Sequence, residues 1–231
     1  MRAAWSDERP HASTAHAGDR LACSPHLWPS QGEPHRKLDI YAYCPYDGCV
    51  LQKGKIWLVA IGAVPANLLD GLTAPLSVTF GRPCEIGAPA AVPRGAFDQR
   101  RNQYPGNAIL STLARLEAPD AERVLGVIDA DCYAPGLNFI FGQAGVDGRS
   151  AFVAVPRLRQ AFYSLREDEP LFHQRALKEA IHELGHTYGL QHCSNPRCVM
   201  HFSNSLYDTD FKSVTFCFSC NAQLERTLAG E

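Results

Sequence analysis

One stretch of the chain decides how the rest is interpreted: HELGHTYGLQHC, residues 182–193. His182 and His186 are four residues apart, so on a helix their imidazoles lie one turn apart on the same face and reach one metal ion. Gly189 accepts the left-handed backbone that ends a helix, which lets the chain return His192 as a third ligand. Three histidines leave one position of a tetrahedral zinc ion open, as in catalytic zinc sites.

Glu183 follows the first ligand and is the predicted general base, because a carboxylate at this position acts on zinc-bound water instead of binding the metal. At the residue frequencies of this chain, the short pattern up to His186 is expected by accident about 0.02 times, and the full pattern up to His192 about 5 times in 100,000. The alternative is a helix with solvated or buried histidines. It gives no reason for Gly189 and His192 at their spacing, so the motif predicts a catalytic zinc site.

Four cysteines follow in two pairs, Cys193 with Cys198 and Cys217 with Cys220. Two pairs of thiolates separated by a loop fill all four positions of a zinc ion, so they predict a structural zinc. Two alternatives stay open: a redox pair at Cys217 and Cys220, or buried cysteines without a shared role. A thioredoxin-like pair is expected early in the fold, near the start of a helix after a strand, whereas this pair lies near the C-terminus.

Met200 lies between the two cysteine pairs and is the only methionine besides Met1. It is either one more core side chain or a support whose thioether packs beneath the three imidazoles. No function is predicted for the remaining cysteines, which are Cys23, Cys44, Cys49, Cys84 and Cys132.

The composition excludes several classes of protein. Of 231 residues, 45% are hydrophobic, enough for one sizeable core. The 22 basic and 24 acidic residues give a net charge of −2 and no electrostatic reason to expect a nucleic acid or an anionic membrane as partner. No apolar run approaches 18 residues, and the N-terminus lacks the apolar core of a signal peptide. We therefore expect a cytoplasmic protein, where clustered cysteines are more often metal ligands than disulfides.

Residues 1–50 are rich in proline, serine, histidine and charge without periodicity, which predicts a flexible N-terminal extension. Residues 51–231 have the pattern of one α/β domain. Its predicted strands are Ile56–Ile61, Leu76–Phe80, Arg123–Asp129, Leu137–Phe141 and Phe152–Val155. Its predicted helices are Ala108–Leu116 and Leu171–Tyr188, the second entered through Asp168-Glu169-Pro170.

The C-terminal motifs resemble those of the archaemetzincins (archaelysins), a family in the metzincin clan of zinc metallopeptidases. That family joins the long histidine motif to a cysteine, a second cysteine, a methionine and a Cys-x-x-Cys, and the matching positions are His182, Glu183, His186, Gly189, His192, Cys193, Cys198, Met200, Cys217 and Cys220. Residues 129–142 and 195–206 look like two further family segments, and the resemblance extends over roughly residues 55–221. One departure is the gap of 16 residues between Met200 and Cys217, one fewer than the family pattern, which a shorter loop would absorb.

The resemblance implies a metzincin-like fold, with a mixed twisted sheet over the active-site helix and a small C-terminal part that holds a structural zinc. It also implies a substrate cleft along an edge strand. From the order of elements we select Ala151–Val155, where an extended peptide would add by β-augmentation. The implied activity is hydrolysis of peptide bonds by a monomer that holds two zinc ions, one catalytic and one structural, and takes a peptide or protein as substrate.

In this hypothesis Glu183 takes a proton from zinc-bound water and Met200 supports the metal site. Tyr207 and His201 lie within chain distance of the oxyanion that forms at the substrate carbonyl.

Two other hypotheses are kept. The first is a catalytically silent or autoinhibited zinc protein that binds peptides, a hypothesis motivated by the extension at residues 1–50. The second is a nucleic-acid-binding zinc ribbon, which is much weaker because such ribbons display clustered Lys and Arg. Between the two cysteine pairs only Arg197 and Lys212 are basic, against Asp208 and Asp210.

Overall fold

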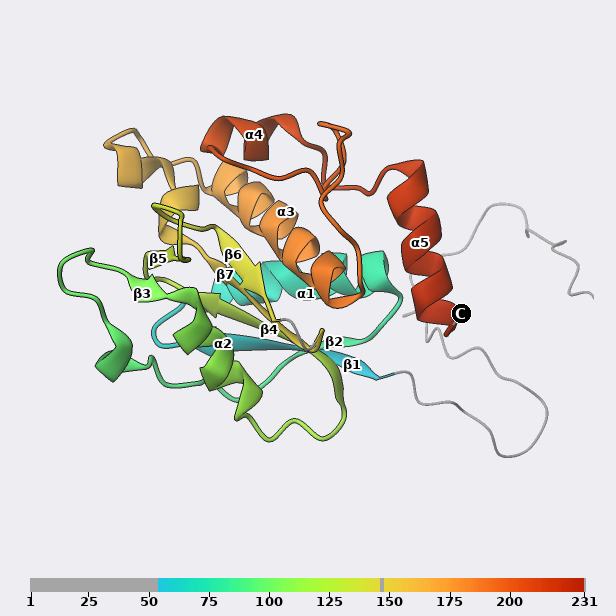
Figure 1. Cartoon of the computed structure of the whole chain (residues 1–231), viewed down its shortest axis with the longest axis horizontal. Helices are drawn as coiled ribbons and strands as arrows, with labels where there is room; N and C mark the ends of the chain where they lie inside the picture. Colours follow the sequence, from blue (N-terminus) through green and yellow to red (C-terminus); the bar gives the residue numbers. More distant parts are fainter. Residues whose placement is uncertain (1–53, 146–147, 231) are drawn as a thin grey trace, which may run out of the picture. The chain divides into compact units, whose positions relative to one another are not determined.

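The structure, a computed structural model, describes residues 54–145 and 148–230 (Figure 1). The predicted extension at residues 1–50 lies outside the described residues, together with Cys23, Cys44 and Cys49. The strands are β1 (Lys55–Ile61), β2 (Cys84–Ile86), β3 (Tyr104–Pro105), β4 (Ala121–Ile128), β5 (Cys132–Tyr133), β6 (Gly142–Ala144) and β7 (Ser150–Ala154). The α-helices are α1 (Ala66–Phe80), α2 (Gly106–Ala114), α3 (Glu169–Thr187), α4 (Leu206–Phe211) and α5 (Phe218–Ala229), and short 3-10 turns occur at η1 (Arg94–Ala96), η2 (Pro156–Leu158) and η3 (Gln160–Tyr163).

The main sheet has five strands in the order β2-β1-β4-β7-β6. The first four run parallel to one another, and β6 pairs antiparallel with β7 at the edge. A small second sheet joins β3 and β5 in parallel. Helix α1 connects the parallel strands β1 and β2, and α2 lies in the connection to β4, whereas β5 and β6 lie between β4 and β7. The predicted α/β fold with a mixed sheet is confirmed.

Helices cover both faces of the main sheet (Figure 1). Successive residues of a strand point to opposite faces, and in β1 this separates Ile56 and Leu58 from Val59 and Ile61. The first pair belongs to the core under α1 and α3, and the second pair belongs to the core under α2. Gly126 of β4 permits a close approach of α2, because a Cβ there would lie 2.9 Å from Leu113 Cδ1.

Helix α3 carries the histidine motif, and its ends follow from local sequence. The Asp168 side chain caps the helix by accepting a hydrogen bond from the backbone N–H of Leu171 at 3.0 Å. Pro170 occupies the first turn, where its missing N–H has no partner to lose. The helix ends at Thr187, and Gly189 follows with a φ of 84°. The helix and its glycine stop are therefore confirmed.

One predicted strand is wrong, since Leu76–Phe80 forms the last turns of α1. The five residues alternate between apolar and polar, but they continue a four-residue spacing. Leu68, Leu72, Leu76 and Phe80 are all buried on one face of α1, and this longer helical period overrides the short alternation.

The predicted substrate edge is also corrected. Strand β7 lies between β4 and β6, so Ala151–Val155 is not an edge of the sheet. The edge is β6, whose sequence Gly-Gln-Ala carries no strand pattern. Leu137–Phe141, predicted as strand-like, forms no regular strand and only an isolated bridge joins Ile140 to Cys132.

Within residues 54–145 and 148–230, no helix is long and apolar enough to cross a membrane.

Candidate active site and metal clusters

Three histidines converge beside α3. One ring nitrogen from each of His182, His186 and His192 lies within 4.8 Å of the other two. The two residues on α3 face each other with their Nε2 atoms 3.1 Å apart. For comparison, two ligand atoms at about 2.0–2.1 Å from a tetrahedral zinc are about 3.3 Å apart. Burial decreases along the motif: His182 is buried, His186 half-buried and His192 exposed.

The backbone fixes the orientation of the two helical imidazoles. His182 Nδ1 donates to the carbonyl of Val199 at 2.8 Å, and His186 Nδ1 donates to the carbonyl of Leu190 at 2.8 Å. A carbonyl oxygen only accepts, so each Nδ1 carries the hydrogen and each Nε2 presents a lone pair. Two lone pairs 3.1 Å apart repel each other unless a cation lies between them. The donor set therefore fits a zinc ion.

The charge state of these imidazoles also fits a metal site. Burial is the largest cause that holds the pKa of His182 well below its ordinary value of 6.5, with positive Lys212 as the next cause. The pKa values of His186 and His192 are lowered as well, again first by burial. Neutral imidazole is the form that binds metal, so protons compete less for these nitrogens.

Glu183 lies in the same cleft but takes no part in the histidine cluster. Its side chain is buried and faces Gly142 on the edge strand, where a Cβ would lie 2.7 Å from Glu183 Oε1. Only glycine leaves room for the carboxylate at this point of β6. Burial, and then the negative charge of Glu179, raises the pKa of Glu183 well above its usual 4.5. A carboxyl group with a raised pKa is suited to exchange a proton near neutral pH.

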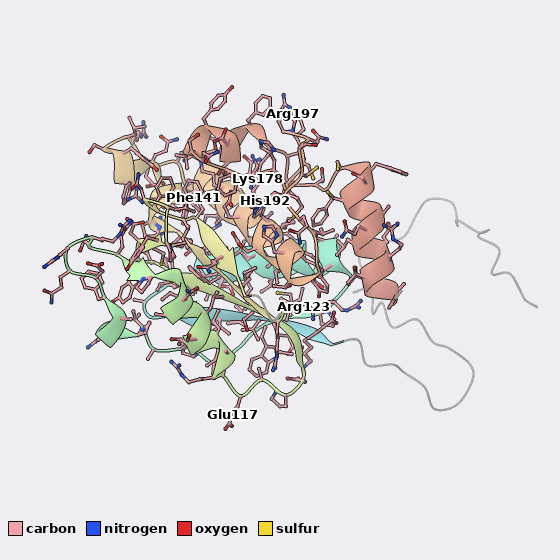
Figure 2. All side chains as sticks on the ribbon, viewed as in Figure 1. Glu117, Arg123, Phe141, Lys178, His192 and Arg197 are labelled. Carbon is pink, nitrogen blue, oxygen red and sulfur yellow. The ribbon has the colours of Figure 1, made fainter. Side chains whose placement is uncertain are left out.

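A cleft of about 200 Å³ opens over these residues. Phenylalanines form much of its apolar lining, and the residues around it are Leu137, Asn138, Phe139, Ile140, Phe141, Gly142, Glu179, His182, Glu183, Phe202, Ser203 and Asn204. Phe141 and His192 both lie beside α3 (Figure 2). The Oγ atom of Ser203 is buried without a hydrogen-bond partner in the part of the chain described, so the cleft also offers a polar group.

Met200 is fully buried against the helix that carries two of the histidines. A Cβ at Gly185 would lie 2.5 Å from Met200 Sδ, so the thioether contacts the helix backbone next to His186. The same turn contacts both the histidine cluster and the cysteine cluster. The carbonyl of Val199 orients His182, and the carbonyl of Met200 accepts the backbone N–H of Cys193 at 2.9 Å.

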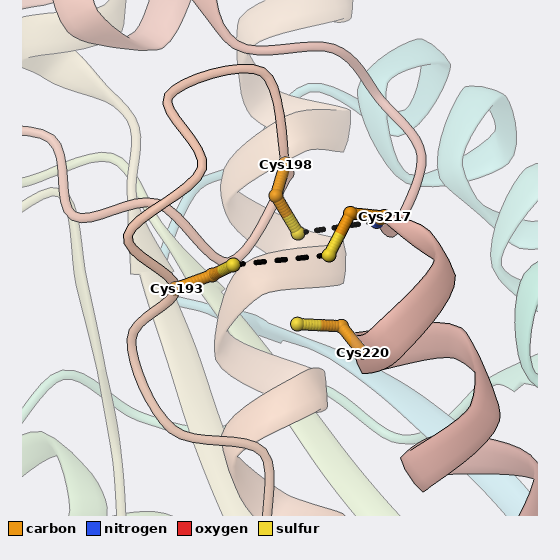
Figure 3. Close-up of side chains that lie close together, drawn as sticks. All are labelled: Cys193, Cys198, Cys217 and Cys220. Atoms are coloured by element: carbon orange, nitrogen blue, oxygen red, sulfur yellow. Dashed lines mark hydrogen bonds between the residues drawn. The ribbon is translucent and has the colours of Figure 1, made fainter.

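The four cysteines also converge, and Figure 3 shows their sulfurs directed toward a common centre. All four Sγ atoms lie within 4.8 Å of one another, and Cys193 Sγ is 3.8 Å from Cys217 Sγ. Sulfurs bound at about 2.3 Å to a tetrahedral zinc are about 3.8 Å apart, whereas disulfide sulfurs are about 2.05 Å apart. All four are free cysteines, so the sulfur geometry fits zinc.

Their electrostatic environments differ. The pKa of Cys217 is lowered to about 6, first because the Ser219 hydroxyl hydrogen-bonds its sulfur and then because the backbone N–H of Cys220 does so. Burial instead raises the pKa values of Cys198 and Cys220. Four sulfurs this close are fully ionised only when a cation balances their charge. All four cysteines would therefore be ionised together only around a bound cation.

Sequence reasoning missed one buried ion pair at the cleft. Lys212 is fully buried with its Nζ 3.1 Å from Glu179 Oε1, which also accepts a hydrogen bond from the Thr209 hydroxyl at 3.0 Å. Glu179 precedes His182 by three residues and so shares its helix face, a signal that would have located it.

Tyr207 is 72% exposed and stacks on Phe211. Neither Tyr207 nor His201 belongs to the cleft lining given above.

Comparisons with known proteins agree with this geometry. The sequence profile of peptidase family M54 matches residues 86–226, more than half of the chain. The archaemetzincin of Pyrococcus abyssi is 42% identical over 181 residues, which cover 76% of this chain and 96% of that protein. The crystal structure of archaemetzincin from Methanopyrus kandleri has 40% identity and a TM-score of 0.70, and covers 78% of this chain and 98% of that one. The archaemetzincin of Archaeoglobus fulgidus, solved in complex with malonate, has 36% identity and a TM-score of 0.63, and covers 73% of this chain and 99% of that one.

Fold and histidine cluster together define a zinc metallopeptidase of the metzincin type. The chain belongs to peptidase family M54, the archaemetzincins. The family predicted from the sequence motifs is confirmed, and with it a zinc-dependent enzyme that acts on peptides or proteins. The alternative of a catalytically silent peptide-binding protein is not favoured.

Proposed function

We propose that His182, His186 and His192 hold the catalytic zinc and that Glu183 is the general base. The observation that carries this assignment is that the cleft reaches the histidine cluster: His182, one of the three converging histidines, and the buried carboxylate of Glu183 both line it. A zinc ion held by three imidazoles supplies a Lewis acid that polarises the scissile carbonyl and lowers the pKa of water.

Glu183 accepts a proton from the attacking water and later delivers it to the leaving amine. No hydrogen-bond donor engages its carboxylate among the described residues, so both oxygens stay available for this transfer. The neighbouring Glu179 is different, because Thr209 and Lys212 already occupy its Oε1 atom. This difference supports Glu183, and not Glu179, as the residue that transfers the proton.

The edge strand β6 supplies a backbone on which to align the substrate. Phe141 and Gly145 exchange hydrogen bonds with β7, through Ala154 N–H and the Ser150 carbonyl. By the alternation of an antiparallel pair, the N–H and C=O groups of Gly142 and Ala144 point away from β7. An extended peptide that adds along these groups would pass Glu183, which contacts Gly142.

We also propose a second zinc ion at Cys193, Cys198, Cys217 and Cys220, with a structural role. This arrangement leaves no ligand position for water, so the ion would hold the chain together without contributing chemistry. It would tie the start of α5 to the loop that follows His192. Met200, packed between the clusters, would support the histidine site from below.

The remaining predictions from the sequence are also proposals. They are a cytoplasmic monomer, no nucleic-acid or membrane partner, and a division into an extension at residues 1–50 and a catalytic domain at residues 51–231.

The test is Glu183→Gln, which keeps the shape of the side chain and removes the base. We expect turnover of a peptide library to fall by about 10³-fold, since general-base catalysis contributes about 10²–10⁴. Zinc content should stay unchanged. Glu169→Gln, at an exposed position on the same helix, is the matched control and should retain activity. Activity within tenfold of wild type in Glu183→Gln would refute the assigned base.

A further inference from the structure

One side of the cleft is formed by a segment without regular structure, Leu137–Phe141, termed here the cleft wall. Phe139, Ile140 and Phe141 line the cavity, as Glu183 does. Few backbone hydrogen bonds fix this segment. Leu137 N–H donates to the carbonyl of Ala134 at 3.0 Å, Ile140 N–H donates to that of Cys132 at 2.9 Å, and the Phe141 carbonyl accepts from Ala154 N–H at 2.8 Å.

Two side chains from the chain just before β3 hydrogen-bond to the backbone of the wall. Arg101 Nη2 donates to the carbonyls of Leu137 and Asn138, each at 3.1 Å. Gln103 Nε2 donates to the Asn138 carbonyl at 2.9 Å. The same Gln103 accepts from Arg101 Nε at 3.0 Å, so the two donors are linked. Gln103 is only 4% exposed, which makes its hydrogen bonds costly to lose.

A carboxylate extends this network to η2. Asp131 Oδ2 accepts a second hydrogen bond from Gln103 Nε2 at 3.0 Å. Both carboxylate oxygens also pair with Arg157, each at 2.7 Å, in the bidentate geometry that gives arginine pairs their directional strength. The two hydrogen bonds therefore set both the position and the orientation of the Arg157 guanidinium.

Arg157 also contacts an aromatic side chain of the wall. Its guanidinium lies 4.5 Å from the ring centre of Phe139 and 4.7 Å from that of Phe162. Phe139 in turn packs edge-on against Phe141 at 5.1 Å. The network thus holds the wall by its backbone at Asn138 and by its side chain at Phe139.

We propose that Arg101, Gln103, Asp131 and Arg157, termed here the brace, are positioning residues that set the width of the cleft for a bound peptide. Among the described residues, no hydrogen bond, ion pair or ring contact joins any of the four to Glu183 or the histidines, so the brace acts on substrate binding through Phe139 and Phe141. Its function rests on the proposed peptidase site, whereas its structural effect on the wall does not.

The test compares Arg157→Lys and Gln103→Leu with Arg159→Lys in the full-length zinc-loaded protein. Lysine keeps the charge of Arg157 but loses the bidentate pair and the flat stacking surface. Arg159 is a matched control, because it is exposed to the same degree (21% against 23%) and stacks on Phe172, away from the wall. Hydrogen exchange of the Leu137 and Ile140 amides reports on the wall without any need for activity, and steady-state kinetics report on the cleft.

We expect the wall amides to exchange at least fivefold faster in both brace variants and at the wild-type rate in Arg159→Lys. KM for peptide should rise about 5- to 10-fold, with kcat within twofold and an unchanged zinc content. Unchanged exchange at the wall would overturn the brace. Faster exchange with unchanged KM would overturn its role in substrate binding. A fall in kcat that follows a lower melting temperature would reduce the effect to general destabilisation.

If the wild type cleaves no peptide but the wall amides exchange faster in the brace variants, the proposed function fails. The brace then only holds the wall in place.

Discussion

The histidine and cysteine clusters adjoin at the bond between His192 and Cys193, yet they are built in opposite ways. Two of the histidines come from one long helix and the third follows its glycine stop by three residues, and the first of them, His182, lines the cleft. The cysteines come from a loop and the start of α5, and four sulfurs close around one centre. The number of protein ligands thus decides whether a metal at either place would act on substrate or hold the chain together.

The two clusters are also joined mechanically. The turn at Val199 and Met200 orients His182 through one carbonyl and holds Cys193 through the next. His201, one residue further on, lies 2.9 Å from the Cys193 carbonyl through its Nδ1 atom. A disturbance of the cysteine cluster should therefore reach the histidines, whereas removing a metal ion from the histidines should leave the cysteine cluster intact.

The largest effect on stability should come from Cys220→Ser. Cys220 is buried in the first turn of α5, and losing its thiolate removes one of four ligands from the proposed structural zinc. We expect a loss of about 4 kcal/mol or more in the free energy of unfolding, because metal binding there is folding free energy. Urea unfolding measures it.

Cys84→Ser is the control, at a half-buried cysteine outside the cluster. If both variants lost the same stability, the cysteine cluster would hold no metal.

Gly185→Ala tests the contact between the histidine helix and the Met200 turn. The new Cβ would lie 2.5 Å from Met200 Sδ and 3.4 Å from a ring carbon of Phe216. Overpacking of this kind costs about 1–3 kcal/mol, and we expect zinc affinity at the histidines to fall while the cysteine zinc is retained.

Gly71→Ala in α1 is the control, where only the movable ring of His173 is close. Unchanged zinc affinity in Gly185→Ala would show that the Met200 turn does not support the site.

The histidine cluster should make the stability of the metal-free protein depend on pH. Burial holds the pKa of His182 well below 6.5 in the folded protein, so below pH 6.5 the unfolded chain binds more protons than the folded one. The stability of the metal-free protein is therefore fully present above pH 6.5 and falls as the pH drops, by at most about 1.4 kcal/mol per pH unit from this residue.

Urea unfolding of the metal-free protein at pH 7.5, 6.5 and 5.5 measures this slope, with His182→Gln as reference. Equal slopes in the two proteins would contradict the assignment to His182.

Met200→Leu should have the smallest effect. Leucine keeps the apolar volume against Gly185, and volume-conserving replacements in a core cost less than about 1.5 kcal/mol. Activity should stay within about tenfold of wild type. A complete loss of zinc from the histidines would mean that the thioether has a role beyond packing.

The sequence was most informative where function depends on local spacing. His182 and His186 share a helix face by their four-residue separation, and Gly189 was predicted to end the helix because few other residues adopt its φ of 84°. The cysteine pairs were found in the same way, through short spacings that chelation requires. Both groups are brought together in the structure as these spacings predict.

Features built from distant residues escaped prediction. The edge strand β6 is three residues long and is defined by its partner β7, since its own sequence has no pattern. Glu179 and Lys212 are 33 positions apart, and in the brace Asp131 is 26 positions from Arg157 and 28 from Gln103. Tertiary packing, which one sequence does not reveal, decides such contacts.

Zinc stoichiometry by elemental analysis of the wild type, His186→Ala and Cys217→Ser tests the two proposed metal sites most directly. We expect two zinc ions per chain in the wild type. His186→Ala should keep one zinc and a folded C-terminal part without activity, and Cys217→Ser should lose the other zinc together with stability. One zinc in the wild type, lost only in Cys217→Ser, would contradict the proposed catalytic site.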